Sequence, residues 1–225
     1  MSKFEMICCV VKNGGASRAL KYAKKFGVEG GTIFLGHGTL KNHLLDKFGF
    51  TDVRKEILCM IVKKSEEAYV INGINSMMNF DRANHHGIIF SYDVPELYGS
   101  HIGSTDNSIS VKEELTQERK EPMYKIIYTV VDRGNGEQVV DAANKAGARG
   151  GTIMNGRGAG IHETQTFFNI AVEPEKEVVF IITKNEEKDK IVEAIRNDLE
   201  IDKPGNGMMY VMDINEVYGL RGKEL

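Results

Sequence analysis

The order of apolar and polar residues predicts a first set of secondary-structure elements in the amino-terminal half of the chain. Apolar runs rich in β-branched residues predict strands over Phe4–Val11, Lys55–Val62 and Ile88–Tyr92. After the first strand, apolar residues at helical spacing predict a helix that ends at Gly27, because glycine accepts the left-handed cap conformation. The stretch GGTIF then predicts a further strand, and Ser65–Met78 predicts a second helix.

The carboxy-terminal half predicts the same elements in the same order. Strands are expected over Lys125–Val131, Glu177–Thr183 and Met208–Met212, with another through GGTIM. One helix ends at Gly147, and a second spans Glu186–Leu199. Each half therefore reads βαββαβ, which predicts an α+β fold of two tandem ferredoxin-like domains, each an antiparallel sheet with both helices on one face. Because one face of each sheet lacks helices, we expect the halves to pack together or the chains to oligomerise.

Residue identities show that the two halves are copies of one unit. A shift of 120 positions aligns matching segments: Gly14 with Gly134, Gly30–Ile33 with Gly150–Ile153, Gly36 and Gly38 with Gly156 and Gly158, and Asp93–Gly99 with Asp213–Gly219. Only the middle of each copy needs a slip of one residue. So ordered a series indicates a tandem duplication. We predict copy one over residues 1–103, a polar and charged linker over 104–121, and copy two over 122–225.

Composition and charge limit the class of protein. Hydrophobic residues make up 41% and charged residues 27%, which is ordinary for a globular protein, and the net charge of −3 gives no reason to expect a nucleic-acid partner. No apolar run reaches the roughly 20 residues that a membrane-spanning helix needs. The first residues predict a strand rather than a signal peptide, and the three cysteines suit buried thiols in a reducing cytoplasm.

Four segments resemble the PII signal-transduction proteins of nitrogen regulation, most closely in copy two. They are Gly147 followed by Gly150–Thr152, the pair Gly156 and Gly158, the stretch Pro204–Val211, and Asp213–Tyr218. The resemblance implies a regulator that is not an enzyme and that forms a trimer of chains. It also implies ATP or ADP as effector and long T-loops, here Gly36–Arg54 and Gly156–Lys176, that dock on a target enzyme or membrane transporter.

The resemblance also implies a set of ligand-binding residues, although several family cations are replaced. Phosphate-holding loops would be Asn79–Gly87 and Asp202–Gly207. The implied ligand-binding residues are Thr152, Gly156, Arg157, Gly158, Gly205, Gly207 and Arg221 in copy two, and Thr32, Gly36, Gly38 and Gly87 in copy one. The family's lysine after its glycine pair is Met208 here, and its loop arginine is Ala159. For each position a simpler role stays open: a turn for glycine, a strand for threonine, and a solvated cation for arginine.

Histidines in copy one suggest an alternative, a metal-binding protein like CutA, which has the same fold. His37, His43, His85 and His86 supply imidazoles, but their spacing matches no tetrahedral zinc pattern. Exposed loop histidines are the favoured explanation, and Cys8 and Cys59 are simplest as small core residues on adjacent strands. Apolar residues in both T-loops indicate either packing across an interface or a docking surface. No nucleophile–base pair or carboxylate dyad repeats between the copies, so we expect no enzyme activity.

Overall fold

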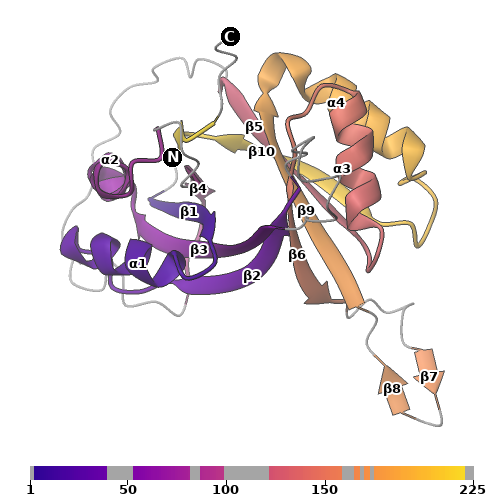
Figure 1. The fold of residues 1–225 in the computed structure, drawn as a ribbon, viewed down its shortest axis with the longest axis horizontal. Helices are drawn as coiled ribbons and strands as arrows, with labels where there is room; N and C mark the ends of the chain where they lie inside the picture. Colours follow the sequence, from indigo (N-terminus) through magenta and orange to yellow (C-terminus); the bar gives the residue numbers. More distant parts are fainter. Residues whose placement is uncertain are drawn as a thin grey trace. The chain divides into compact units, whose positions relative to one another are not determined.

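The computed structural model describes residues 3–39, 53–81, 87–98, 122–158, 165–167, 170–172 and 175–220. The chain forms two compact units (Figure 1). The first unit comprises Met1–Ile33, Glu56–Met123 and Asp213–Leu225, and the second comprises Phe34–Lys55 and Tyr124–Met212. Each unit thus takes one short segment from the other copy of the repeat. The predicted linker, residues 104–121, and the predicted loop histidines 43, 85 and 86 lie outside the described residues.

Copy one contains the elements that the apolar pattern predicts. Where both ends of an element were predicted, neither differs from the observed end by more than two residues. In chain order they are β1 (Phe4–Lys12), α1 (Ala16–Lys25), β2 (Thr32–Gly38), β3 (Val53–Lys63), a short 3₁₀ helix (Lys64–Glu66), α2 (Glu67–Met78) and β4 (Gly87–Val94). The sheet order is β2-β3-β1-β4. Strand β1 pairs antiparallel with β4, with Phe4 opposite Val94 and Cys8 opposite Phe90.

Copy two repeats this plan. Its elements are β5 (Tyr124–Asp132), α3 (Gly136–Lys145), β6 (Thr152–Arg157), β9 (Glu175–Lys184), α4 (Asn185–Asp198) and β10 (Met208–Ile214). The sheet order β6-β9-β5-β10 matches that of copy one. This common order, in which the first strand lies between the third and the fourth, confirms the predicted α+β, ferredoxin-like fold.

Three short strands were not predicted. Strands β7 (Gln165–Phe167) and β8 (Ile170–Val172) form an antiparallel hairpin within the second predicted T-loop. Strand β11 (Val217–Tyr218) pairs with β4, so the end of copy two completes the sheet of the first unit. None of the helices in the described part of the chain is long and apolar enough to cross a membrane.

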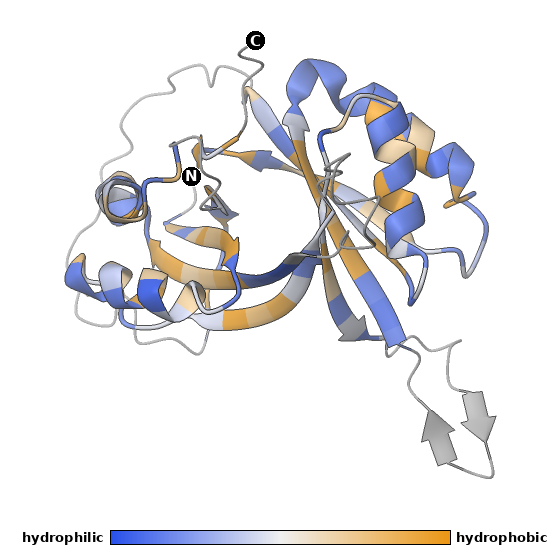
Figure 2. Ribbon diagram, in the orientation of Figure 1, coloured by the Kyte–Doolittle hydropathy of each residue, from blue (hydrophilic) through white to orange (hydrophobic). Residues whose placement is uncertain are grey.

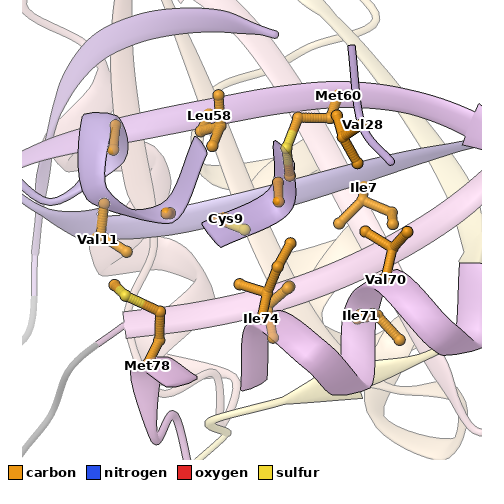
Figure 3. Close-up of a cluster of buried hydrophobic side chains, with 14 of the residues drawn as sticks. Ile7, Cys9, Val11, Val28, Leu58, Met60, Val70, Ile71, Ile74 and Met78 are labelled. Atoms are coloured by element: carbon orange, nitrogen blue, oxygen red, sulfur yellow. The ribbon is translucent and has the colours of Figure 1, made fainter. Parts of the chain in front are cut away.

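Each copy has its own hydrophobic core between its sheet and its helices. In the first unit the core joins β1, β3 and α2, with Ile7, Leu58 and Ile74 fully buried (Figure 3). In the second unit, Ile127, Ile181 and Ile191 occupy the corresponding layer and are also fully buried. Helices α3 and α4 alternate between hydrophobic and hydrophilic residues along their length (Figure 2), as helices that cover one face of a sheet do.

The sheet face without helices differs between the copies. In copy two, aromatic rings from three neighbouring strands contact one another: Tyr128 lies 5.1 Å from Tyr210 and 5.8 Å from Phe180, measured between ring centroids. In copy one, Cys8 and Cys59 take the places of Tyr128 and Phe180, and their Sγ atoms are 3.4 Å apart. This contact confirms that the two cysteines lie on adjacent strands, and both are free thiols.

A cluster of charged groups anchors the returning end of copy two within the first unit. The carboxylate of Glu5 is fully buried, accepts a hydrogen bond from Lys64 Nζ, and accepts another from Asn215 Nδ2 at 2.8 Å. Asp93 accepts from Lys64 at 2.8 Å and from Asn215 at 3.2 Å. Burial, with a hydrogen bond to Asp93, raises the pKa of Glu5 to about 7. Burial opposes ionisation of Asp93 as well, but hydrogen bonds from Glu5, Lys64 and Asn215 outweigh it and lower the pKa of Asp93.

The raised pKa of Glu5 predicts that the chain loses stability as the pH rises from 4.5 to about 7. Across this window the folded chain holds a proton on Glu5 that the unfolded chain releases, so folding is favoured at the lower pH. The slope from this one group is at most about 1.4 kcal/mol per pH unit. Asp93 does not offset it, because its lowered pKa adds stability that is lost only below pH 3.8.

Denaturant unfolding at several pH values, on the native chain and on Glu5→Gln, measures this slope. Glutamine mimics the protonated carboxyl group, so the variant should have a flatter profile than the native chain between pH 4.5 and 7. Lys64 and Glu67 also face the cluster and are left unchanged in both proteins. Parallel profiles for the two proteins would contradict the assignment of the bound proton to Glu5.

Candidate anion-binding site

One end of the copy-two sheet gathers the segments on which the implied site depends. Strand β5 ends there at Asp132, β9 begins there at Glu175, and β6 ends there at Arg157. The antiparallel register places Lys176 between Asp132 on one side and Gly156 on the other. Strand β10 also begins at this end. Gly207 directly precedes β10, and a Cβ added to Gly207 would lie closest to the carbonyl oxygen of Val130, near the end of β5.

A pocket of about 380 Å³ lies at this end of the sheet. Six residues line it: Arg133, Asn155, Gly156, Arg157, Glu175 and Lys176. All six come from the turn after β5, the end of β6 or the start of β9, and all belong to the second unit. The pocket therefore opens where the second predicted T-loop leaves and rejoins the sheet.

The charges around this pocket leave one arginine without an ion pair. Arg133 forms an ion pair with Glu175 and also feels the charge of Glu177, and Lys176 forms an ion pair with Asp132 at 2.6 Å. Arg157 is exposed and makes no ion pair with any described residue. Arg157 is therefore the cation that can attract a small anion. Guanidinium groups suit phosphate or carboxylate because they can donate two parallel hydrogen bonds.

The amino terminus of helix α3 lies beside this pocket, but an internal carboxylate already occupies it. Buried Glu177 on β9 accepts a hydrogen bond at 2.7 Å from the backbone N–H of Gly136, the first residue of α3. In copy one, Glu56 accepts at 2.8 Å from Ala16, the first residue of α1. These two glutamates align in the repeat. An anion in the pocket must therefore be held by the cationic side chains rather than by this helix terminus.

The glycines of the implied phosphate loop have a structural role of their own. Gly207 has a φ of +142°, and a Cβ there would lie 2.5 Å from the carbonyl oxygen of Val130. Gly87, its counterpart in copy one, has a φ of +138°, and a Cβ there would lie 2.0 Å from the oxygen of Val10. Both positions require glycine for the turn into the last strand. Gly205, with a φ of +91°, faces open space, which leaves its backbone approachable by a ligand.

Thr152, expected to contact a ligand, lies between two paired strands. It is opposite Phe180 of β9 on one side and Gly38 of β2 on the other, and only 7% of its surface is exposed. The β2 pairing continues with Gly36 opposite Met154. The structure thus supports the strand role that the sequence left open for Thr152, whose side chain has little surface left for a ligand.

The implied site residues are therefore only partly assembled. Gly156 and Arg157 line the pocket, Gly158 follows them directly, and Gly205 and Gly207 precede β10 at the same end of the sheet. Gly36 and Gly38 lie on β2, which pairs with β6 on the side away from β9 and the pocket. Thr32 and Gly87 lie in the first unit. Arg221 lies outside the described residues. Sequence reasoning missed Arg133 and Lys176. Each is a single cation next to a predicted strand, and neither belongs to a recognisable sequence motif.

The alternative metal site gains no support from the described residues. Within them, no group of three or more His, Cys, Asp or Glu residues is placed to hold a metal ion. His37 alone of the four candidate histidines is described, and it lies within β2 opposite Ile153.

The fold and the pocket together define a class: a ferredoxin-like α+β domain with an arginine-bearing pocket at the base of a long loop. Residues 124–224 match the family model for nitrogen regulatory protein P-II. The matched residues lie within copy two, where the sequence resemblance to the PII family is strongest. No curated protein matches the chain.

Several solved structures resemble part of the chain. GlnK from B. subtilis is 20% identical, with 40% of this chain and 84% of that chain covered and a TM-score of 0.32. A B. subtilis GlnK–ATP complex is 18% identical, with coverages of 43% and 96% and a TM-score of 0.33. PII from Arabidopsis thaliana bound to citrate is 20% identical, with coverages of 41% and 76% and a TM-score of 0.32.

A threonine contributed by copy one fixes the start of β6, and its removal should loosen the second unit. Thr39 Oγ1 accepts a hydrogen bond from Gly151 N–H at 3.1 Å and donates one to Gly151 O at 3.2 Å. Thr39→Val keeps the shape but leaves Gly151 N–H without this acceptor, while Gly151 O keeps the hydrogen bond from Thr39 N–H at 3.1 Å. We therefore expect a loss of about 1 kcal/mol in the free energy of unfolding. Thr39→Ser, which keeps the hydroxyl, should lose less. Thermal unfolding measures both, and a larger loss for Thr39→Ser than for Thr39→Val would show that the methyl group, not the hydroxyl, matters.

Proposed function

We propose that this chain is a non-enzymatic PII-like regulator that senses a small anionic ligand of the adenine-nucleotide class and acts on a target protein through its two long loops. The pocket at the base of the second loop carries the proposal, because it joins Arg157, which lacks an ionic partner among the described residues, to Arg133 and Lys176. Its position inside the segment that matches the PII family supports the same assignment.

In this proposal Arg157 makes the first contact with the anion. Arg133 and Lys176 are each paired with a carboxylate, so they can turn toward a phosphate only by sharing or releasing it. Such a release would break the ion pair between Arg133 and Glu175, and Glu175 is the residue at which the long loop rejoins β9. Binding in the pocket would in this way change the conformation of the loop that contacts the target, an enzyme or a membrane transporter in nitrogen-related regulation.

Copy one lacks both arginines of this pocket, although Lys55 aligns with Lys176. By the alignment of the repeat, Asn13 stands in place of Arg133, Leu35 in place of Asn155 and His37 in place of Arg157. Leu35 is 68% exposed, so an apolar side chain occupies a position where copy two has an amide. We therefore propose one anion site per chain, in copy two, within a homo-oligomer for which a trimer is favoured.

The pocket proposal predicts that ATP or ADP raises the melting temperature of the native chain and that Arg157→Gln weakens this effect. A guanidinium–phosphate contact is worth about 1.5–3 kcal/mol, so the variant should bind at least tenfold more weakly. Arg18→Gln is a matched control, because Arg18 is an exposed arginine on α1 of the first unit. Thermal-shift assays with ATP, ADP, AMP, cyclic dinucleotides and 2-oxoglutarate, followed by titration calorimetry, measure the effect.

Two results would count against this function. If none of these ligands raises the melting temperature of the native chain, the sensor loses its ligand and an interaction scaffold remains. If Arg157→Gln binds as tightly as Arg18→Gln, the ligand lies elsewhere. Metal analysis of the purified native chain, beside a variant in which His85→Ala and His86→Ala are combined, separates the CutA-like alternative. Only that alternative predicts bound metal that the double substitution removes.

A further inference from the structure

Two thiols face each other on the helix-free side of the sheet in the first unit. Cys8 on β1 and Cys59 on β3 have their Sγ atoms 3.4 Å apart, although 51 positions separate them in the chain. Their neighbours Cys9 and Leu58 lie in the hydrophobic core beneath the helices. Because side chains alternate along a strand, Cys8 and Cys59 point to the opposite face of the sheet.

The repeat indicates that these two cysteines are directly opposite in the sheet. Cys8 aligns with Tyr128 and, after the slip of one residue, Cys59 aligns with Phe180. Tyr128 and Phe180 are partners in the antiparallel register of β5 and β9, and the corresponding strands β1 and β3 are also neighbours. Opposite residues on antiparallel strands have Cα atoms roughly 4.5–5.5 Å apart, which is within the range that a disulfide needs.

Only a small movement separates the two thiols from a covalent bond. Both are free, so the structure holds the pair in its reduced form. To form a disulfide, the Sγ atoms have to approach from 3.4 Å to about 2.05 Å. Rotations of the two side chains about their Cα–Cβ bonds supply a shift of this size, because the spacing of the strands is already suitable.

The two thiols differ in access and in acidity. Cys8 is buried, with Cys59 on one side and the hydroxyl of Tyr92 4.0 Å from its Sγ, whereas Cys59 is half-buried. The hydrogen bond from Cys8 outweighs burial and lowers the pKa of Cys59, while the same contact and burial raise the pKa of Cys8. Since the thiolate is the nucleophile in cysteine chemistry, Cys59 is the sulfur that reacts first.

The third cysteine has the surroundings of a structural residue. Cys9 is fully buried among the core side chains, as Figure 3 shows. Burial, together with the charge of Cys59, raises the pKa of Cys9. Cys9 is adjacent to Cys8 in the chain but points to the other face, which makes it an internal control for the reactivity of the pair.

We propose that Cys8 and Cys59 are a modification site, at which hydrogen peroxide oxidises the thiol pair to a disulfide and a small thiol reduces it again. The Cys59 thiolate attacks one oxygen of the peroxide, the O–O bond breaks, and the departing hydroxide takes up a proton to become water. This step leaves Cys59 as a sulfenic acid. The Cys8 sulfur then attacks the Cys59 sulfur, the S–O bond breaks, and the departing hydroxide leaves with the Cys8 proton as a second water.

The electrons and protons balance in both directions. In the forward direction two thiols lose two electrons and two protons, and the peroxide takes them up as it becomes two molecules of water. In the reverse direction two molecules of a small thiol, such as glutathione, restore both cysteines by thiol–disulfide exchange and leave as their own disulfide. Both partners are thus small molecules that can reach the half-buried Cys59.

This chemistry belongs to copy one alone and goes beyond the proposed function. Tyr128 and Phe180 stand at these two positions in copy two, so that copy has no thiol pair. The site lies in the first unit, whereas the anion pocket lies in the second. Strand β3 begins at Val53, at the end of the first predicted T-loop, so the disulfide would tie the strand that follows this loop to β1.

Peroxide titration of the reduced native chain tests the proposal. Free thiols, counted after denaturation, should fall from three to one per chain, and dithiothreitol should restore all three. Peptide mapping without reduction should find Cys8 joined to Cys59 within one chain. Cys9→Ala should still lose two thiols, because Cys9 takes no part. Circular dichroism checks that each variant is folded.

Two further variants separate the roles of the paired sulfurs. Cys8→Ser keeps a hydrogen-bond donor beside Cys59 but removes the second thiol, so a sulfenic acid should persist on Cys59 and be trapped by a dimedone probe. Cys59→Ser should be oxidised at least about tenfold more slowly than the native chain, because a buried thiol such as Cys8 supplies little thiolate.

Three results would overturn the proposal. One is a native chain that keeps three free thiols after the peroxide has oxidised an equal amount of free cysteine in the same solution. Another is a disulfide that involves Cys9 or joins two chains. The third is a Cys59→Ser variant that is oxidised as fast as the native chain. Because nucleotide binding enters none of these measurements, failure of the anion site leaves them unchanged.

Discussion

The antiparallel register of β5, β9 and β6 is the constraint on which the candidate site depends. One row of this register aligns Asp132, Lys176 and Gly156, and the next places Arg157 opposite Glu175. Arg133 joins that row through a backbone hydrogen bond to Glu175 O at 3.1 Å. Because side chains alternate between the faces of a strand, a slip of one residue in β9 would turn Lys176 to the other face of the sheet, and would turn Glu175 over in the same way. The pocket thus exists only while the register of all three strands holds.

Duplication has preserved the fold of the two copies while their surfaces have diverged. Paired features such as the capping carboxylates Glu56 and Glu177, or the positive-φ glycines Gly87 and Gly207, hold the same backbone in each copy. By contrast, the two arginines of the pocket occur in copy two alone, although Lys55 matches Lys176, and copy one has two thiols where copy two has aromatic rings. Residues that the backbone requires are therefore shared, while most residues that a ligand or a partner would contact are not.

The sequence predicted the elements and their order because alternation and helical spacing are local patterns. It also identified Gly156 and Arg157 of the pocket through the family resemblance. It missed Arg133 and Lys176, since isolated cations at strand ends look like any solvated residue until the register brings them together. It missed β11 as well, because two residues carry no periodicity. The shared position of Glu56 and Glu177 in the repeat was a readable signal of the helix caps, but which donor each carboxylate meets depends on the tertiary fold.

A crystal structure of the chain grown with ATP tests the central claim most directly, because it locates the anion rather than inferring it from affinity. The account predicts phosphate density in copy two, within hydrogen-bonding distance of Arg157 and with Arg133 or Lys176 as a second partner, and none beside Asn13 and His37 in copy one. Phosphate bound beside those copy-one residues, or density in copy two that contacts none of the three cations, would contradict it.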